Sequence, residues 1–98
     1  MVKIDHLEFP KFELGKCAAT HRAAAFLSTC SIRVEYLLRR HACGDWGDIT
    51  DAEKAANEAA IGTDSSIMSG YIVDDTKVWV YTNQKKGKTL VCLSGENP

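Results

Sequence analysis

The chain has 98 residues, of which 45% are hydrophobic and 26% are charged, values close to those of an average globular domain. This length supports one hydrophobic core, so we expect residues 1–98 to form a single domain. The formal net charge of −1 at pH 7 excludes a general nucleic-acid coat, which needs excess lysine and arginine, and wholesale DNA mimicry, which needs excess acid.

The N-terminus and the cysteines indicate the compartment. No stretch has the length and apolarity of a membrane span, and residues 1–6 lack the apolar core of a secretory signal, so we expect a cytoplasmic protein without membrane contact. The cysteines, none of them in a Cys-x-x-Cys pair, are Cys17, Cys30, Cys43 and Cys92. We expect reduced thiols rather than disulfides, and the wide spacing disfavours zinc. We also expect no other metal and no cofactor.

The first elements predicted along the chain are an arm and a strand. Pro10 ends a short arm of mixed composition, residues 1–10. Residues 11–17 alternate between apolar and polar types, which predicts a strand. A proline before the strand suits a strand start.

Two helices are predicted next. Thr20 is placed to cap the first helix, and Ser31 to cap the second. The second helix carries one apolar stripe at helical spacing, formed by Val34, Leu37, Leu38 and His41. Gly44 is well placed to end it.

A third helix has the clearest start signal. Thr50 and Glu53 have the spacing of a capping box, and Gly62 is the expected stop. Its small residues form a stripe of Ala52, Ala55, Ala56, Ala59 and Ala60. Because small side chains permit close approach, we expect this stripe to lie against a sheet or another helix.

From Ser66 onward the hydrophobic period changes to two. Residues 67–73, 77–83 and 88–93 are rich in β-branched and aromatic types, which predicts three strands. The loops between them are short enough for hairpins, so we expect an antiparallel meander. The predicted fold class is α+β: an N-terminal strand, three helices, and then a three-stranded meander packed on the helices.

The most distinctive string is Gly-Asp-Trp-Gly-Asp at residues 44–48. In a structural interpretation the glycines permit unusual backbone angles, Trp46 fills the core, and Asp45 or Asp48 caps a helix. In a functional interpretation the loop presents Trp46 to a partner, because tryptophan is favoured at interface hot spots.

His41 and Cys43 precede this string and are the residues with the chemistry of a nucleophile and its base. Two residues apart on a helix they point to different sides, so they form no dyad by themselves. We therefore expect His41 to be a semi-buried packing and capping residue. The sequence contains no recognisable catalytic motif, and we expect no enzyme.

Basic residues gather in two places along the chain, namely Arg33, Arg39 and Arg40 in the second helix and Lys85, Lys86 and Lys88 in the last hairpin. If the two groups lie together, they can contact phosphates. The alternative is a solvated helix surface and a charged hairpin tip that discourages edge pairing. Such local clusters in a balanced chain suit a protein-binding surface with complementary charge.

Trp79 and Tyr81 alternate with Val78 and Val80 along the middle strand of the meander. If the valines face the helices, the aromatic residues lie on an open face with Lys77, and Tyr71 can join them. Such a face is typical of a binding surface or a homodimer interface. In the alternative, Trp79 faces the core and the valines lie outside.

Four segments carry a family resemblance: HACGDWGD (41–48), ANEAA (56–60), IMSGY (67–71) and KVWVYT (77–82). The chain resembles, over about residues 13–93, a family of small, mostly uncharacterised proteins of bacterial plasmids, integrative elements and prophages. It departs at its end, where relatives tend to have an acid in place of Asn83 and an arginine-rich turn in place of residues 84–88. The resemblance implies a mobile-element setting more than a mechanism.

The main functional prediction is a non-enzymatic protein that binds and inhibits or modulates a host protein complex, such as a defence effector of the CRISPR or restriction type. The candidate partner contacts are Arg39, Arg40, Asp45, Trp46, Trp79 and Tyr81. The alternative is a small nucleic-acid-binding regulator that uses the arginines and lysines named above. A thiol-dependent enzyme at Cys43 is the third hypothesis.

Overall fold

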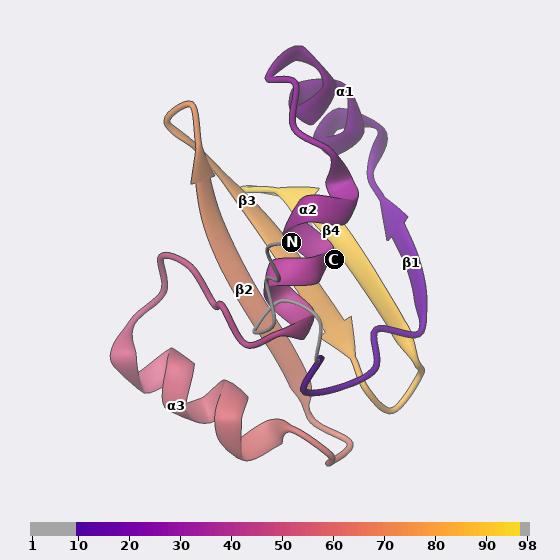
Figure 1. Cartoon of the computed structure of the whole chain (residues 1–98), viewed down its shortest axis with the longest axis vertical. Coiled ribbons are helices and arrows are strands. Elements are labelled where there is room, and N and C mark those ends of the chain that lie inside the picture. The colour runs from indigo at the N-terminus through magenta and orange to yellow at the C-terminus, as the bar shows by residue number, and fades with distance from the viewer. Residues whose placement is uncertain (1–9, 97–98) are drawn as a thin grey trace, which may run out of the picture.

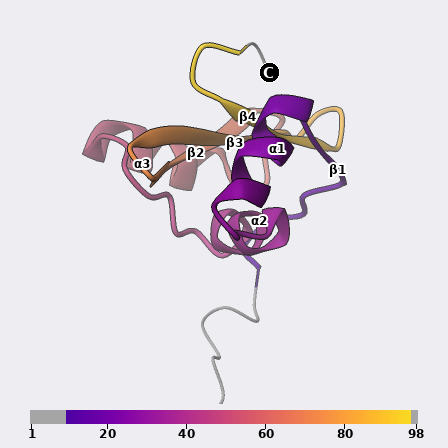
Figure 2. The same cartoon turned by 90° about the horizontal axis from the view of Figure 1, so that it is seen from above.

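A mixed four-stranded sheet forms one layer of the molecule, and helices lie against it (Figures 1 and 2). The computed structural model describes residues 10–96. Its elements are β1 (Lys16–Ala19), α1 (His21–Thr29), α2 (Val34–Ala42), α3 (Asp51–Ala60), β2 (Ser66–Val73), β3 (Thr76–Asn83) and β4 (Lys88–Leu93). The predicted α+β class is confirmed, whereas residues 1–9 of the predicted arm lie outside the described residues.

Strands β2, β3 and β4 form the predicted antiparallel meander. Asp74 and Asp75 alone make the turn between β2 and β3, with φ angles of 48° and 63°. Two central residues with positive φ are typical of a type I′ turn, whose twist matches that of the strands it joins. The turn therefore sets the register in which Val73 pairs with Thr76.

The prediction of a purely antiparallel sheet is wrong, because β1 joins it in parallel beside β4. The strand order is β1-β4-β3-β2, and Lys16 pairs with Lys88. Parallel pairing needs a long crossover, which the three helices together with β2 and β3 provide. The strand predicted at 11–17 also begins later, at Lys16, because Gly15 turns the chain with a φ of 67° and lies against the carbonyl of Gly87.

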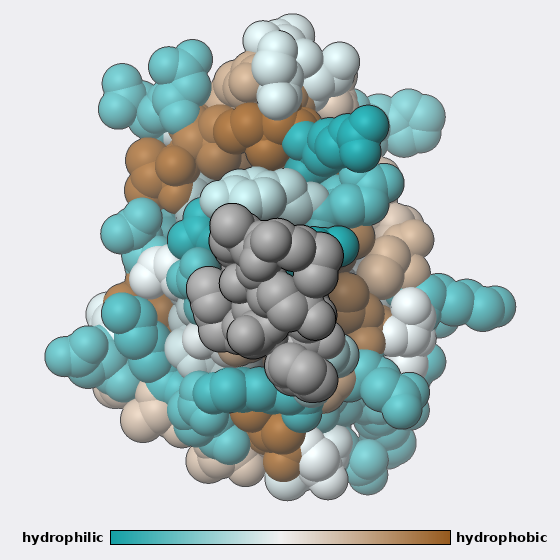
Figure 3. Space-filling model, viewed as in Figure 1, coloured by the Kyte–Doolittle hydropathy of each residue, from teal (hydrophilic) through white to brown (hydrophobic). Residues whose placement is uncertain are grey.

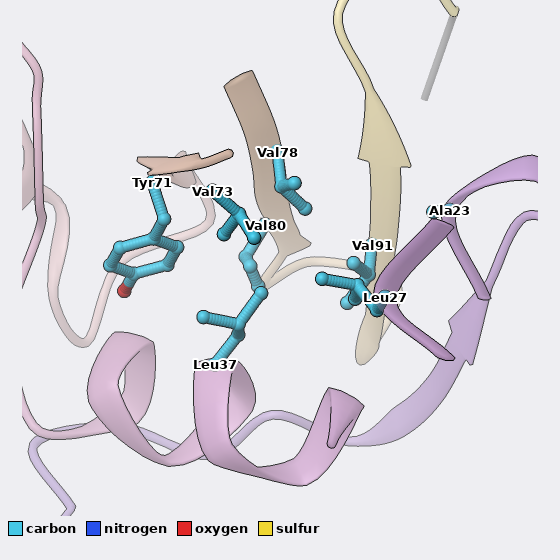
Figure 4. Close-up of a cluster of buried hydrophobic side chains, with 8 residues drawn as sticks. All are labelled: Ala23, Leu27, Leu37, Tyr71, Val73, Val78, Val80 and Val91. Carbon is cyan, nitrogen blue, oxygen red and sulfur yellow. The ribbon is translucent and has the colours of Figure 1, made fainter. Parts of the chain in front are cut away.

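Helices α1 and α2 cover one face of the sheet (Figure 2). The main core lies between these helices and the sheet (Figure 4), and its residues are Ala23, Leu27, Leu37, Tyr71, Val73, Val78, Val80 and Val91. Full burial of one valine or leucine contributes about 1.5–3 kcal/mol, so this cluster is the main source of stability.

The connection between α1 and α2 confirms one predicted cap and corrects another. Thr20 caps α1, accepting a hydrogen bond from the Ala23 amide. Ser31 does not cap α2: it has a φ of 58°, and Ile32 donates to the Leu27 carbonyl over 2.9 Å. This is the bonding pattern that closes a helix C-terminus, with Ser31 in the position that glycine usually takes. Ser31 therefore belongs to the end of α1, and α2 begins after Arg33.

Helix α3 lies alongside the edge strand β2 (Figure 1). Its predicted capping box is confirmed, since Thr50 and Glu53 exchange hydrogen bonds of 2.8 and 3.1 Å. The predicted packing of the alanine stripe is wrong, because only Ala60 is buried and the other four alanines are exposed. Asn57 is buried instead, because its side-chain amide bonds both backbone groups of Met68 at the edge of the sheet.

Candidate functional site

A chain of buried polar side chains runs between α2 and the sheet. His41 bonds through Nδ1 to the Ser69 hydroxyl (2.5 Å) and through Nε2 to the Thr82 hydroxyl (2.9 Å). Thr82 bonds to the Thr89 hydroxyl (2.7 Å), which donates to the carbonyl of Leu14 (2.6 Å). Because Thr89 donates its only proton to that carbonyl, Thr82 must donate to Thr89, and His41 must donate from Nε2. The network therefore has one direction and selects one imidazole tautomer.

This network assigns His41 a structural role. Its side chain is fully buried, and burial lowers its pKa to about 3, so the imidazole is neutral near pH 7. Both ring nitrogens are engaged with Ser69 and Thr82, so neither is placed to act as a base for Cys43. The prediction of a packing residue is confirmed, and the burial is complete rather than partial. None of the four cysteines forms a disulfide.

Trp46 is buried in a second core cluster, with only 5% of its surface exposed. Its ring stacks on Phe12 with the centroids 6.1 Å apart, and its indole N–H donates to Glu58 over 3.0 Å. The structural interpretation of Trp46 is therefore the correct one. A buried ring with a satisfied N–H presents no surface to a partner, so Trp46 is removed from the predicted contacts.

The segment around Gly47 and the side chain of Asn57 together protect the free edge of β2. The Gly70 amide donates to the Trp46 carbonyl (3.1 Å), and the Asp48 amide donates to the Gly70 carbonyl (2.6 Å). Two residues earlier on β2, the Asn57 amide group bonds both backbone groups of Met68. These contacts satisfy groups that would otherwise template pairing with another chain.

Gly47 is required for this approach. Its φ is 75°, and a Cβ at this position would lie 2.2 Å from the Gly70 carbonyl oxygen. The two glycines of the distinctive string thus serve backbone geometry, as the structural interpretation predicts.

No helix of residues 10–96 lies on the opposite face of the sheet (Figure 2). Of the two orientations left open for β3, the structure has the one in which Val78 and Val80 are buried under the helices, while Trp79 and Tyr81 are half-buried on the other side. Tyr71 does not join them: it lies in the helix-covered core and donates to the Asp45 carbonyl. We call this surface the open face, and the strand residues that point to it are Lys16, Ala18, Ser66, Met68, Gly70, Ile72, Lys77, Trp79, Tyr81, Asn83, Lys88, Leu90 and Cys92.

The open face has an apolar half on β2 and β3. Ile72 is 51% exposed and Met68 is 38% exposed, both unusual for large apolar side chains. Lys77 places its ammonium group 4.4 Å from the centroid of the Trp79 ring, a cation–π contact. Trp79 lies across Gly70, where any Cβ would meet the ring at 3.0 Å, so the glycine lets the ring lie flat on the sheet.

The open face also has a cationic half. An open hollow of about 560 Å³ lies where β1, β4 and the β3–β4 hairpin meet. We call it the lysine hollow, and the residues that line it are Lys16, Cys17, Ala18, Tyr81, Asn83, Lys86, Lys88, Thr89 and Leu90. None of these residues is acidic, and none of the strands of the described chain contains an aspartate or glutamate. The sheet therefore presents only positive formal charge.

The exposed face of α2 forms a separate basic surface, on the helix side of the molecule. A smaller hollow there is lined by Arg33, Glu35, Arg39, Arg40 and the 54%-exposed Tyr36. Arg40 bonds Asp45 over 2.7 Å and lies 4.5 Å from the centroid of the Tyr71 ring, so its guanidinium is already held within the chain. Figure 3 shows both hydrophilic and hydrophobic residues on this side of the molecule.

The two predicted contact sets are therefore each divided between surfaces. Among the predicted partner contacts, Arg39, Arg40 and Asp45 lie on the helix side, whereas Trp79 and Tyr81 lie on the open face. The predicted basic patch separates in the same way, because the arginines line the hollow on α2 and two of the lysines line the lysine hollow. Lys85 is exposed in the hairpin turn and lines neither. Sequence reasoning missed Lys16, because it did not pair β1 with β4.

Residues 10–96 contain neither a membrane-spanning helix nor a cluster of metal ligands. In that range no helix combines the length and hydropathy of a membrane span. The same residues contain no group of three or more His, Cys, Asp or Glu side chains that could hold a metal ion.

Comparison of the chain with protein-family models, with curated proteins and with solved structures gives no match.

Proposed function

We propose that the chain is a non-enzymatic binding protein that docks on a host protein complex through its open face and inhibits or modulates that complex. A defence effector of the CRISPR or restriction type is the proposed class of target, in keeping with the resemblance to mobile-element proteins. The observation that supports the proposal is the combination of Trp79, Ile72 and Met68 on a sheet face without a covering helix.

The composition of this face suits a protein partner. Aromatic residues and methionine are enriched at interface cores, and exposed apolar patches mark contact sites on soluble proteins. The lysines around the apolar half favour a partner surface with acidic groups at its rim, because such complementarity steers association. The hollow on α2 offers a partner fewer unpaired cationic groups than the lysine hollow does, since Arg40 is held by Asp45 and Tyr71.

A catalytic role has little support in the geometry. His41 is neutral, buried and bonded at both nitrogens, so it is not poised for proton transfer. Burial raises the pKa of the Cys17 and Cys92 thiols, which lowers their reactivity. Binding without chemistry is the simpler role for this chain.

The test is quantitative affinity capture from host extract with a matched pair of variants. Ile72→Glu places a charge at an exposed position of the open face, and Tyr36→Glu places the same charge at an equally exposed position of α2. We expect Ile72→Glu to lower capture of the specific protein partner at least ten-fold, because a buried unpaired charge opposes docking. Tyr36→Glu should leave capture unchanged, and each capture is made both with and without nuclease.

Four outcomes contradict the proposal. Equal loss of capture in both variants, or loss of capture only in Tyr36→Glu, would show that the interface is not the open face. Self-association of the purified chain that Ile72→Glu abolishes would make a second copy the occupant of the face. Captured protein that disappears after nuclease treatment would make nucleic acid the direct ligand.

A further inference from the structure

We propose that the lysine hollow binds single-stranded nucleic acid, with the lysines on its phosphates and a base stacked on Tyr81. This adds a second ligand to the proposed function and does not depend on it, because the hollow lies at the opposite half of the open face from Ile72. The proposal rests on three features of the described residues: the charge of the hollow, its aromatic surface and its accessibility.

Charge is the first feature. Lys16 comes from β1, Lys86 from the hairpin turn and Lys88 from β4, so segments far apart in sequence bring three ammonium groups to one hollow. No carboxylate among the lining residues neutralises them. Ammonium groups bind phosphate as point charges and need no fixed geometry, which suits a flexible polyanion.

An aromatic surface is the second feature. Tyr81 lines the hollow, and its hydroxyl bonds Ser66 over 2.8 Å, which fixes the orientation of the ring. Trp79 follows on the same face of β3, about 7 Å away along the strand, since alternate residues of a strand share a face. A positively charged groove with aromatic rings along it is the general design of sequence-tolerant single-strand binding.

Accessibility is the third feature, and it separates this hollow from the other basic surface. Lys16, Lys86 and Lys88 are exposed and make no ion pair within the described chain, whereas Arg40 on α2 is bonded to Asp45.

The flat surface of the sheet favours a single strand over a duplex. A duplex presents its bases edge-on inside grooves, and a flat sheet offers no element to enter a groove. The unstacked bases of a single strand can instead lie on an exposed ring.

The experiment is a salt titration of the purified full chain with a fluorescent twelve-nucleotide oligothymidylate, followed by anisotropy. Each phosphate contact on a single strand contributes about 0.7 to the slope of log K against log salt, so contacts from the three lysines predict a slope of about −2 or steeper. The triple variant Lys16→Ala, Lys86→Ala, Lys88→Ala should reduce the magnitude of the slope by about 2. Tyr81→Leu should weaken binding about 5- to 150-fold, the range for loss of one base–aromatic stack.

Lys54→Ala provides the matched control, because Lys54 is an exposed lysine on α3, away from the hollow. It should change neither affinity nor slope. Absence of oligonucleotide binding, or equal losses in Lys54→Ala and the hollow variants, would overturn the proposal. So would competition by poly-glutamate as effective as that by unlabelled oligothymidylate, because the hollow would then accept acidic protein segments. None of these outcomes bears on nuclease-resistant protein capture, so the two proposals fail separately.

Discussion

The two faces of the sheet are built from alternate residues of the same strands, yet they have opposite chemistry. On β3, Val78, Val80 and Thr82 face the helices and are fully buried, while Lys77, Trp79 and Tyr81 face the open side and are half-buried. The helix-covered face even contains a neutral histidine in a closed hydrogen-bond network. The difference shows that stability and binding are divided between faces, because a period of two assigns each residue to one side only.

Acid should lower the free energy of unfolding through His41, a residue of the helix-covered face. The folded state holds His41 with a pKa near 3, whereas the unfolded chain titrates near 6.5. Unfolded molecules therefore bind a proton that folded ones do not, so stability is constant above pH 6.5 and falls as the pH decreases toward 3. The total loss is at most about 5 kcal/mol, of which roughly 2 kcal/mol falls between pH 6.5 and 5.

Urea unfolding at pH 7.5, 6.5, 5.5 and 5 measures this effect. The window above pH 5 isolates His41, because hydrogen bonds lower the pKa of the Glu53 and Glu96 carboxyls, whose loss of stability comes at more acidic pH. His41→Ala should remove the dependence, and the exposed His21→Ala should retain it. A flat profile in the wild type would show that His41 is not held neutral.

Truncation of neighbouring residues on β3 sharpens the comparison of the faces. Val80→Ala should reduce the free energy of unfolding by about 2–3 kcal/mol, because it removes fully buried methyl groups from the core. Tyr81→Ala should cost about 1 kcal/mol or less, since it loses one exposed hydroxyl bond and part of a half-buried ring. Thermal or urea unfolding measures both. Similar losses at the two positions would contradict the division between a structural and a binding face.

Local rules of the sequence predicted a large part of this fold. The Thr50–Glu53 capping box, the Thr20 cap and the meander all depend on residues close together in the chain. Each is determined by hydrogen-bond geometry or by hydrophobic period, and tertiary context supports the same answer. The side that Val80 faces stayed open between two alternatives, because a period of two does not say which face is covered. The two interpretations of Trp46 are both consistent with its sequence, and its burial, its stack on Phe12 and its bond to Glu58 distinguish them.

Long-range pairing accounts for what the sequence did not reveal. The parallel pairing of β1 with β4 places Lys16 beside Lys88, and no local sequence pattern predicts that the two residues are neighbours. The lysine hollow depends on that pairing, so the sequence does not predict the hollow either. The alanines of α3 suggested close packing, but the helix attaches through Asn57 to backbone groups at an edge, and that role has no periodic signature.

The central claim is that partners meet the open face, and chemical footprinting of lysines tests it most directly. The chain is acetylated free and in the complex captured from host extract, and the modified lysines are quantified by mass spectrometry. We expect protection of Lys77 and Lys88 on the open face and unchanged reactivity of Lys54 on α3. Protection of Lys54 with Lys77 and Lys88 still reactive would contradict the account, because the partner would then lie on the α3 side of the molecule.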